Sequence, residues 1–358
     1  MDATTIVQWA TVGLGSVAIS LGMVTVGIAI RHHWRDGRIE AARPAIATEI
    51  FSRLDEDDPD WDTWTEGLTS PERTVARTLG KQLLRQVHGN EREKLRGLVA
   101  RVGVSPKRLQ RDVESRSTYR TLRALSWLSL LEYPSVVDAA LRRCPSHQDV
   151  RTATARVLHE TGDERAPRTG IRLLVWEGTE PLSVFGLDTL YQIASQEPEY
   201  LLSIASDGSD GWNDPVLVQV LTVVRYCQSE TDPASLRWVR HCLDHESTAV
   251  RAAALATLVE YSWNEQLRNA VSLDDYLTDP EPAVRRVAYQ AMRTWDIQDV
   301  ESFARRVTDE PDDLARLAGV RALRHRTGGH LPISRTSEAF DRTWRWVDAE
   351  LGVVPAES

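Results

Sequence analysis

The side chains best suited to binding a metal are two histidines and a cysteine in one short segment. His241 and His245 stand four residues apart, with Cys242 between them. On a helix this spacing can place both imidazoles on one zinc ion, but a structural zinc site has four protein ligands. The sequence contains neither an HExxH motif nor a distant Cys or His pair that would complete the set. We therefore predict packing residues here, with no metal site and no cofactor.

Two other short patterns are weaker candidates for ligand binding. The acidic run Asp55–Asp62 alternates like a calcium loop but lacks the glycine and the terminal glutamate of an EF-hand, so we expect a solvated linker. Gly13-Leu14-Gly15 lies within an apolar stretch and follows no strand, which excludes a nucleotide-binding loop. Because the chain also has no GxSxG nucleophile elbow, it is predicted to be non-catalytic, and no small-molecule substrate is inferred.

The N-terminus carries a long apolar stretch with no charged residue between Ala3 and Ile30. As a helix, the segment Ile6–Ile30 would be about 37 Å long, enough to cross a hydrocarbon core of about 30 Å. Met1-Asp2 supplies no basic region of the kind that begins a signal peptide. Residues 1–37 are therefore predicted to form a retained transmembrane anchor with a basic flank.

The charges beside this span predict its orientation. Arg31, Arg35 and Arg38 follow it, whereas only Asp2 precedes it, and the positive flank of a span stays in the cytoplasm. We predict a single-pass protein of the cell membrane, with the N-terminus outside and the C-terminal body cytoplasmic. Small residues at helical spacing in the span would permit close packing against a partner helix; they are Gly13, Ser16, Ser20 and Gly27.

The stretch Pro71–Arg123 is strongly basic, with fourteen Arg or Lys residues against five acids. Behind an anchor, such cations could rest on anionic lipid headgroups, at about 1 kcal/mol each, or on an acidic partner protein. A solvated basic face that pairs with acids of the solenoid is an equal alternative. A membrane-docked nucleic-acid binder is a further one, disfavoured by the net charge of −9. The candidate residues are Arg73, Arg77, Lys81, Arg85, Arg92, Lys94, Arg96, Arg101, Lys107, Arg108 and Arg111.

A repeated phrase organises the rest of the chain. AVRAAALATLVE at Ala249–Glu260 recurs as AVRRVAYQAMRT at Ala283–Thr294, and more loosely as DLARLAGVRALRH at Asp313–His325. The aliphatic residues that lead each phrase are spaced by 28, 32, 34, 34, 34 and 30 residues, a period typical of stacked helical hairpins. These lead residues are Leu122, Val150, Leu182, Val216, Val250, Val284 and Leu314.

Each hairpin must bury its apolar face against its neighbours, so the repeats should share one continuous core. Ala234–Leu243 and Leu267–Leu277 are expected to be the second helices of two hairpins. The arginines that follow three lead residues are expected to bind acids in neighbouring turns as a structural ladder, rather than to form an anion-binding row; they are Arg151, Arg251 and Arg285.

Five tryptophans are spread through the repeats. At helical spacing we expect them in the core between repeats, and the alternative is an aromatic row on the concave face that would suit a peptide or sugar chain. They are Trp176, Trp212, Trp238, Trp263 and Trp295.

The repeats resemble a known family. A turn followed by Val-Arg and then alanines, as in Ala249-Val250-Arg251 and Ala283-Val284-Arg285, is similar to the HEAT repeat over about Thr118 to Arg326. This resemblance implies an α-solenoid, more often a binding scaffold than an enzyme. The segment Leu95–Leu122 resembles the lead-in of some prokaryotic membrane-anchored HEAT proteins, which often accompany a membrane glycosyltransferase. The resemblance thus implies a membrane glycosyltransferase as the class of integral membrane partner.

We therefore predict an all-α protein, with an N-terminal single transmembrane helix followed by a solenoid of HEAT-like helical hairpins. The juxtamembrane lead-in spans residues 38–115, the repeats span 116–330, and a capping helix with a tail spans 331–358. The predicted function is a non-catalytic, membrane-anchored scaffold or accessory subunit that binds its partner through the transmembrane helix and the cytoplasmic solenoid. The main alternative is a lyase-like enzyme with a site on the concave face.

Overall fold

The computed structural model describes residues 36–143, 147–227, 232–295, 299–331, 333–334 and 336–352, together with Met23 and Thr25. All regular secondary structure in these ranges is helical, which confirms the predicted all-α class. The chain divides into two compact units, unit 1 at Met1–Arg143 and unit 2 at Cys144–Ser358.

The predicted transmembrane span lies outside the described residues, apart from Met23 and Thr25. Within the described part of the chain, no helix is long and apolar enough to cross a membrane. The anchor and its topology therefore stay predictions from the sequence.

Unit 1 begins with a helix over residues 36–54 that runs through Pro44 without a break. Asp60 then caps the next helix by accepting a hydrogen bond from the Thr63 N–H (3.1 Å). The acidic run Asp55–Asp62 is therefore more than the expected linker, because Asp60 caps this helix and Asp62 lies in its first turn. The later helices are α2 (Trp61–Gly67), α3 (Ser70–Leu83), α4 (Asn90–Arg101), α5 (Pro106–Val113), α6 (Thr118–Leu131) and α7 (Pro134–Arg143).

The core of unit 1 is formed between packed pairs of helices. α3 packs on α4, while α5 packs on both α6 and α7. Leu95 and Leu98 of α4 and Leu125 of α6 are fully buried. A Cβ atom at Gly80 would lie 2.7 Å from a Val99 methyl carbon, so only glycine allows α3 to approach α4 this closely.

Unit 2 consists of stacked helical hairpins. Its elements are α8 (Gln148–Glu160), the π-helix η1 (Ala166–Gly170), α9 (Ile171–Leu174), η2 (Trp176–Gly178), α10 (Val184–Ala194), α11 (Pro198–Gly208), η3 (Ser209–Gly211), α12 (Asp214–Cys227), η4 (Pro233–Leu236), α13 (Arg237–His241), η5 (Cys242–Asp244), α14 (Thr248–Glu260), α15 (Glu265–Asn269), α16 (Leu273–Tyr276), α17 (Pro282–Ala291), α18 (Val300–Asp309), α19 (Asp313–Thr327) and α20 (Glu338–Glu350).

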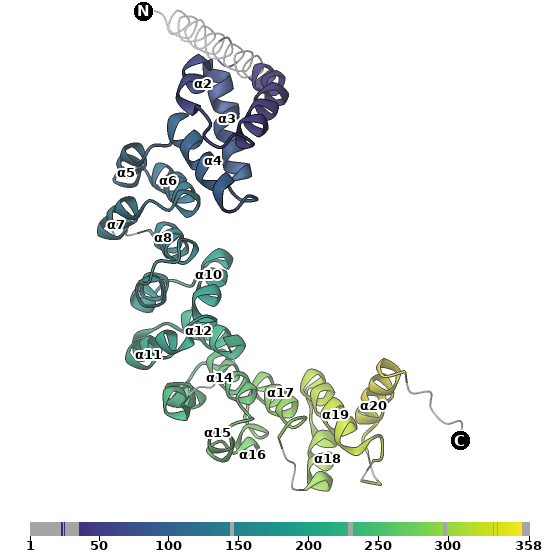
Figure 1. Ribbon diagram of the computed structural model, residues 1–358. Coiled ribbons are helices and arrows are strands. Elements are labelled where there is room, and N and C mark those ends of the chain that lie inside the picture. Colours follow the sequence, from purple (N-terminus) through teal and green to yellow (C-terminus); the bar gives the residue numbers. More distant parts are fainter. Residues whose placement is uncertain are drawn as a thin grey trace, which may run out of the picture. The chain divides into compact units, whose positions relative to one another are not determined.

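The helices that carry the repeated phrase form one layer of unit 2. We call α8, α10, α12, α14, α17 and α19 the lead helices, and each packs on the next along the stack. Figure 1 shows α12, α14, α17 and α19 following one another, with α11, α15, α16 and α18 on the other side of the unit. α20 packs on α19 and buries Phe340 and Val347, so it covers the end of the stack as expected. This arrangement is consistent with an α-solenoid.

The second helices of two hairpins are shorter than the sequence predicts. Ala234–Leu243 falls within the three short elements η4, α13 and η5, while Leu267–Leu277 is divided between α15 and α16. In the second segment Ser272 stands at the break, as the N-cap of α16. Polar caps inside an apolar segment favour a new helix over a continuous one.

The buried lead position of a repeat lies three residues after the N-cap of its helix. Val150 follows His147 in this way, Val250 follows Ser247 and Val284 follows Glu281, and these valines are 4%, 0% and 0% exposed. Val216 is equally buried, and its N–H is capped by the Asn213 side chain (3.0 Å). The predicted register is therefore correct for these four repeats.

The register is wrong at Leu314, which is 57% exposed. Asp312 caps α19, so Ala315, which is fully buried, takes the lead position one residue later. At Leu182 the side chain is buried, at 6% exposed, but it precedes the N-cap Ser183 of α10, so the position relative to the helix start is wrong. At Leu122 the fit is partial, since this side chain is only half-buried. In each case the register was predicted from the position of an aliphatic residue, whereas the N-cap determines where the helix begins.

Candidate interaction surfaces

The arginines beside the lead positions form a ladder within unit 2. Arg251 donates to both carboxylate oxygens of Asp279 (3.2 Å each) and to the backbone carbonyls of His245 and Glu246 (3.0 and 2.9 Å). It thereby joins the turn before its own helix to the turn before the next lead helix. Such a bidentate, largely buried pair stabilises one geometry of the two turns.

Arg285 repeats this pattern one hairpin later. It donates to both carboxylate oxygens of Glu310 (2.9 and 2.7 Å) and to the carbonyls of Asp279 and Pro280 (both 2.9 Å). Arg316 reaches the Glu310 carbonyl (2.8 Å), as expected if Ala315 is the lead residue. With Arg151 on Glu180 (2.9 Å), these contacts confirm the predicted structural ladder.

The residues predicted to act within the membrane lie outside the described ranges. They are the small-residue face Gly13, Ser16, Ser20 and Gly27, and the flanking arginines Arg31 and Arg35.

Five of the predicted basic residues in unit 1 bind groups of the same unit. Lys94 donates to the carbonyls of Leu54 and Glu56 (2.8 and 2.5 Å). Arg92 and Arg96 pair with opposite oxygens of Glu132 (2.9 and 2.6 Å). Arg101 pairs with Asp62, and Lys81 donates to the Ser126 hydroxyl (2.9 Å). These side chains hold helices together, and Arg92 and Arg96 do so through Glu132, an acid within the predicted repeats.

Lys81 is partly buried, and burial affects the pKa of its ammonium group. Desolvation, and secondarily the positive charge of Arg85, lowers the pKa of the Lys81 ammonium. Its Nζ lies 4.9 Å from the centre of the Trp127 ring, a cation–π distance. Lys81 is therefore a packing residue as well as a hydrogen-bond donor.

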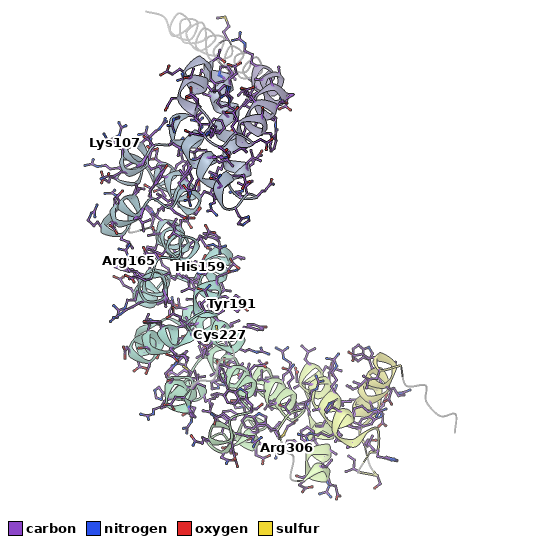
Figure 2. All side chains as sticks on the ribbon, in the orientation of Figure 1. Lys107, His159, Arg165, Tyr191, Cys227 and Arg306 are labelled. Atoms are coloured by element: carbon purple, nitrogen blue, oxygen red, sulfur yellow. The ribbon has the colours of Figure 1, made fainter. Side chains whose placement is uncertain are left out.

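The remaining basic residues point outward. Arg38, Arg73 and Arg85 are exposed singly, and Arg77 lines a small pocket with Arg108 and Arg123. On α5 and the start of α6, five exposed cations have no ion-pair partner among the described residues; we call them the α5–α6 basic face, and they are Lys107, Arg108, Arg111, Arg116 and Arg120. Figure 2 shows Lys107 projecting from α5.

The sequence prediction omits Arg116, Arg120 and Arg123 from its candidates. The available signal was the composition of the stretch that contains them, because Pro71–Arg123 includes all three. Tyr119, which is 72% exposed, stands beside them, and the Arg123 guanidinium carbon lies 6.0 Å from its ring centre.

The residues considered for zinc do not share one helix. α13 ends at His241, Cys242 is buried in η5, and His245 follows as its C-cap. The Nδ1 atom of His245 accepts a hydrogen bond from the Ser247 N–H (3.1 Å), which occupies one of its two ring nitrogens. Desolvation raises the pKa of the Cys242 thiol to about 11, which disfavours the thiolate that binds metals.

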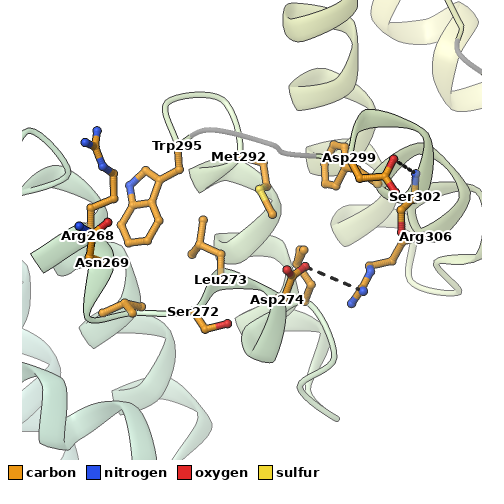
Figure 3. A pocket seen from close by; sticks show the side chains of 13 residues that line it. Arg268, Asn269, Ser272, Leu273, Asp274, Met292, Trp295, Asp299, Ser302 and Arg306 are labelled. Atoms are coloured by element: carbon orange, nitrogen blue, oxygen red, sulfur yellow. Dashed lines mark hydrogen bonds and ion pairs between the residues drawn. The ribbon is translucent and has the colours of Figure 1, made fainter. Parts of the chain in front are cut away.

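The tryptophans divide between core and surface. Trp238 and Trp295 are 6% and 5% exposed, as predicted for core residues, but Trp176 and Trp263 are 42% and 55% exposed. Trp295 lines a pocket of about 570 Å³ between α16 and α18 (Figure 3). The charges in its wall are of both signs, with Arg306 and Asp274 4.0 Å apart, so they favour no single class of ligand.

A groove of about 410 Å³ crosses the exposed side of four consecutive lead helices, α12, α14, α17 and α19. Three arginines and a histidine line it against one acid, Glu260. Arg225 donates to Glu260 (2.9 Å), and Arg321 pairs with Glu350 (3.0 Å). Arg293 is exposed and has no ion-pair partner in the part of the chain that the structure describes. We call this feature the lead-helix groove.

No protein-family model matches this chain, and no curated protein or solved structure is significantly similar to it. The resemblance to HEAT repeats therefore stays a prediction from the sequence.

Proposed function

We propose that this chain is a scaffold or accessory subunit that binds a protein partner through the lead-helix groove of unit 2. The observation that carries the proposal is the groove itself, because four consecutive repeats contribute side chains to one continuous surface. A surface assembled in this way suits an extended segment of polypeptide, which can contact successive repeats in turn.

The chemistry of the groove favours an acidic segment. Arg293 offers a guanidinium with no ion-pair partner among the described residues, whereas Arg225 on α12 and Arg321 on α19 are held by Glu260 and Glu350. Ala256, Val259 and Val287 supply small apolar surface between these charges. Arginine can bind carboxylates with two parallel hydrogen bonds, which gives geometric specificity as well as attraction.

The membrane part of the proposal is supported by the sequence. The uncharged stretch before Arg31 is long enough to hold the chain in a bilayer, and the partner is then an integral membrane protein. A membrane glycosyltransferase is the class that the resemblance of Leu95–Leu122 implies. A lyase-like site on the same face remains the alternative, and turnover of a substrate would favour it over binding alone.

Charge reversal in the groove is expected to release the partner. With Arg293→Glu, capture from gently solubilised native membranes should recover at least about tenfold less partner, the loss expected when one charge-assisted contact becomes a repulsion. Mass spectrometry of the captured material checks this result. Arg305→Glu is the matched control, because Arg305 is exposed on α18 of the other layer and pairs only with Glu301. Equal recovery with both variants would place the partner surface elsewhere.

The salt dependence of the captured complex distinguishes a protein partner from nucleic acid. Binding to many phosphates weakens steeply as salt rises, whereas a groove that combines apolar and paired contacts should change little over the same range. Nuclease treatment that removes the captured material would contradict a protein partner.

The predicted topology has its own test. A reporter fused after Ser358 that functions only in the cytoplasm should be active, because the basic flank Arg31–Arg38 lies on the C-terminal side of the span. A second reporter, active only after export, should be silent at the same position. The opposite pattern of activity would contradict the predicted orientation and place the groove outside the cytoplasm.

A further inference from the structure

Three arginines from different helices of unit 1 line one small pocket. Arg77 comes from α3, Arg108 from α5 and Arg123 from α6, and the pocket between them measures about 130 Å³. This volume corresponds to about four water molecules at liquid density, close to the size of a phosphate group. Its floor is apolar, since Val104, Leu109, Ala124 and Trp127, which complete it, are all buried.

Among the residues that line this pocket, Asp112 is the one acid. Asp112 lies at the edge of the pocket, and its carboxylate is 3.3 Å from the nearest nitrogen of Arg123. Arg108 donates to the Gly103 carbonyl (3.1 Å) and has no carboxylate partner among the described residues. The lining of the pocket therefore carries more positive than negative charge, and the Arg108 guanidinium keeps N–H groups able to take another acceptor.

We propose that this three-arginine pocket binds the phosphate group of a phosphate ester. Guanidinium groups match the tetrahedral oxygens of phosphate with pairs of hydrogen bonds, and arginine keeps its charge at all physiological pH values. The apolar floor lowers the local polarity, which strengthens the attraction relative to an open surface.

The same chemistry has two natural sources, the headgroup of an anionic phospholipid and a soluble phosphate ester. The pocket is separate from the lead-helix groove, so the proposal does not depend on the partner of unit 2. Its test is likewise separate from partner capture.

Asp112 provides the most discriminating variant. Its carboxylate competes with an incoming phosphate for Arg123, so Asp112→Asn should raise the affinity, about fivefold or more, while keeping the shape of the side chain. Arg108→Gln and Arg123→Gln should each weaken binding about tenfold. A gain of affinity in one variant cannot result from a damaged fold.

The measurement is calorimetric titration of the full-length chain with sn-glycerol 3-phosphate, in a mild neutral detergent and a phosphate-free buffer. Lys107→Gln is the matched control, because it removes an exposed cation from the same helix without touching the pocket. We expect saturable binding that this variant leaves unchanged. Absence of saturable binding, an equal loss with Lys107→Gln and Arg108→Gln, or no gain with Asp112→Asn would each overturn the proposal.

A second arm identifies the source of the phosphate. The titration is repeated in nanodiscs of phosphatidylcholine, with and without phosphatidic acid. If a lipid headgroup occupies the pocket, phosphatidic acid should lower the apparent affinity of the wild type for glycerol phosphate. If the natural ligand is soluble, glycerol phosphate should bind equally well in both kinds of nanodisc. Either result supports the phosphate site, whereas loss of all binding in both discs would contradict it.

Discussion

Val284→Asp is expected to destabilise unit 2 by about 3–5 kcal/mol. Val284 is fully buried in the lead position of α17, which packs between α14 and α19. The neighbouring cation, Arg285, is already held by Glu310, so a new carboxylate at this position has no partner. Because folded domains are stable by only about 5–15 kcal/mol, one such change consumes a large part of the total.

Leu314→Asp is the matched control for this substitution. The repeat period places Leu314 in the same class of position as Val284, but its side chain is 57% exposed. It also lies in the first turn of α19, where an acidic side chain interacts favourably with the helix dipole. We therefore expect a change within about 0.5 kcal/mol, as for other surface substitutions.

Urea unfolding of the full-length chain in a mild detergent, followed by far-ultraviolet circular dichroism, compares the two variants. A large loss for Val284→Asp with almost none for Leu314→Asp supports the register defined by the helix caps. Equal losses would instead support the register defined by the aliphatic residues.

The helical repeats could be predicted because their determinants are local. In the phrase around Val250 and Arg251, apolar spacing, a preceding turn and a following arginine all occur within a few residues. The ladder from Arg251 to Asp279 was predictable for a related reason, since equal periods bring each arginine beside the next turn. Leu314 shows the limit of this reasoning. The apolar pattern favours this leucine as the buried lead residue, but it is exposed and the next residue, Ala315, is buried instead.

Which basic residues of unit 1 form ion pairs within the unit, and which stay exposed, could not be predicted from the sequence. Arg96 and Arg108 look equivalent in the sequence, yet Arg96 pairs with Glu132, 36 residues later in the chain, whereas Arg108 pairs with no acid in the part of the chain that the structure describes. The three-arginine pocket likewise requires α3, α5 and α6 to converge. Tertiary packing decides such contacts, and a single sequence contains no periodic signal for them.

Glu310→Ala is expected to cost about 3–5 kcal/mol, because it leaves a buried arginine without its carboxylate. The Glu310 side chain is 3% exposed and accepts two hydrogen bonds from Arg285. It also accepts from the Tyr289 hydroxyl (3.1 Å) and from the Asp312 N–H (3.0 Å). Glu310 lies in the turn between α18 and α19, and its carboxylate is the acceptor for four donors. The substitution leaves all four without this acceptor.

The pH dependence of stability gives this prediction a second readout. Desolvation acts to raise the pKa of Glu310, but the hydrogen bonds from Arg285, Asp312 and Tyr289 outweigh it and hold the pKa below its usual value of 4.5. A depressed carboxyl pKa contributes stability above pH 4.5 that is lost as the pH falls through the folded-state value. The wild type should therefore approach Glu310→Ala in stability as the medium is acidified through this window.

A double-mutant cycle separates the ion pair from the packing around it. Glu310→Leu alone should be as costly as Glu310→Ala, whereas adding Arg285→Met should recover part of the loss, because no buried charge then remains unpaired. Glu301→Ala is the surface control, since its partner Arg305 is 65% exposed and such pairs contribute only about 0.3–0.5 kcal/mol. Urea unfolding of the wild type, Arg285→Met, Glu310→Leu and the double variant measures the cycle. If the two core substitutions prove simply additive, Arg285 and Glu310 contribute independently, and the ladder does not couple adjacent repeats.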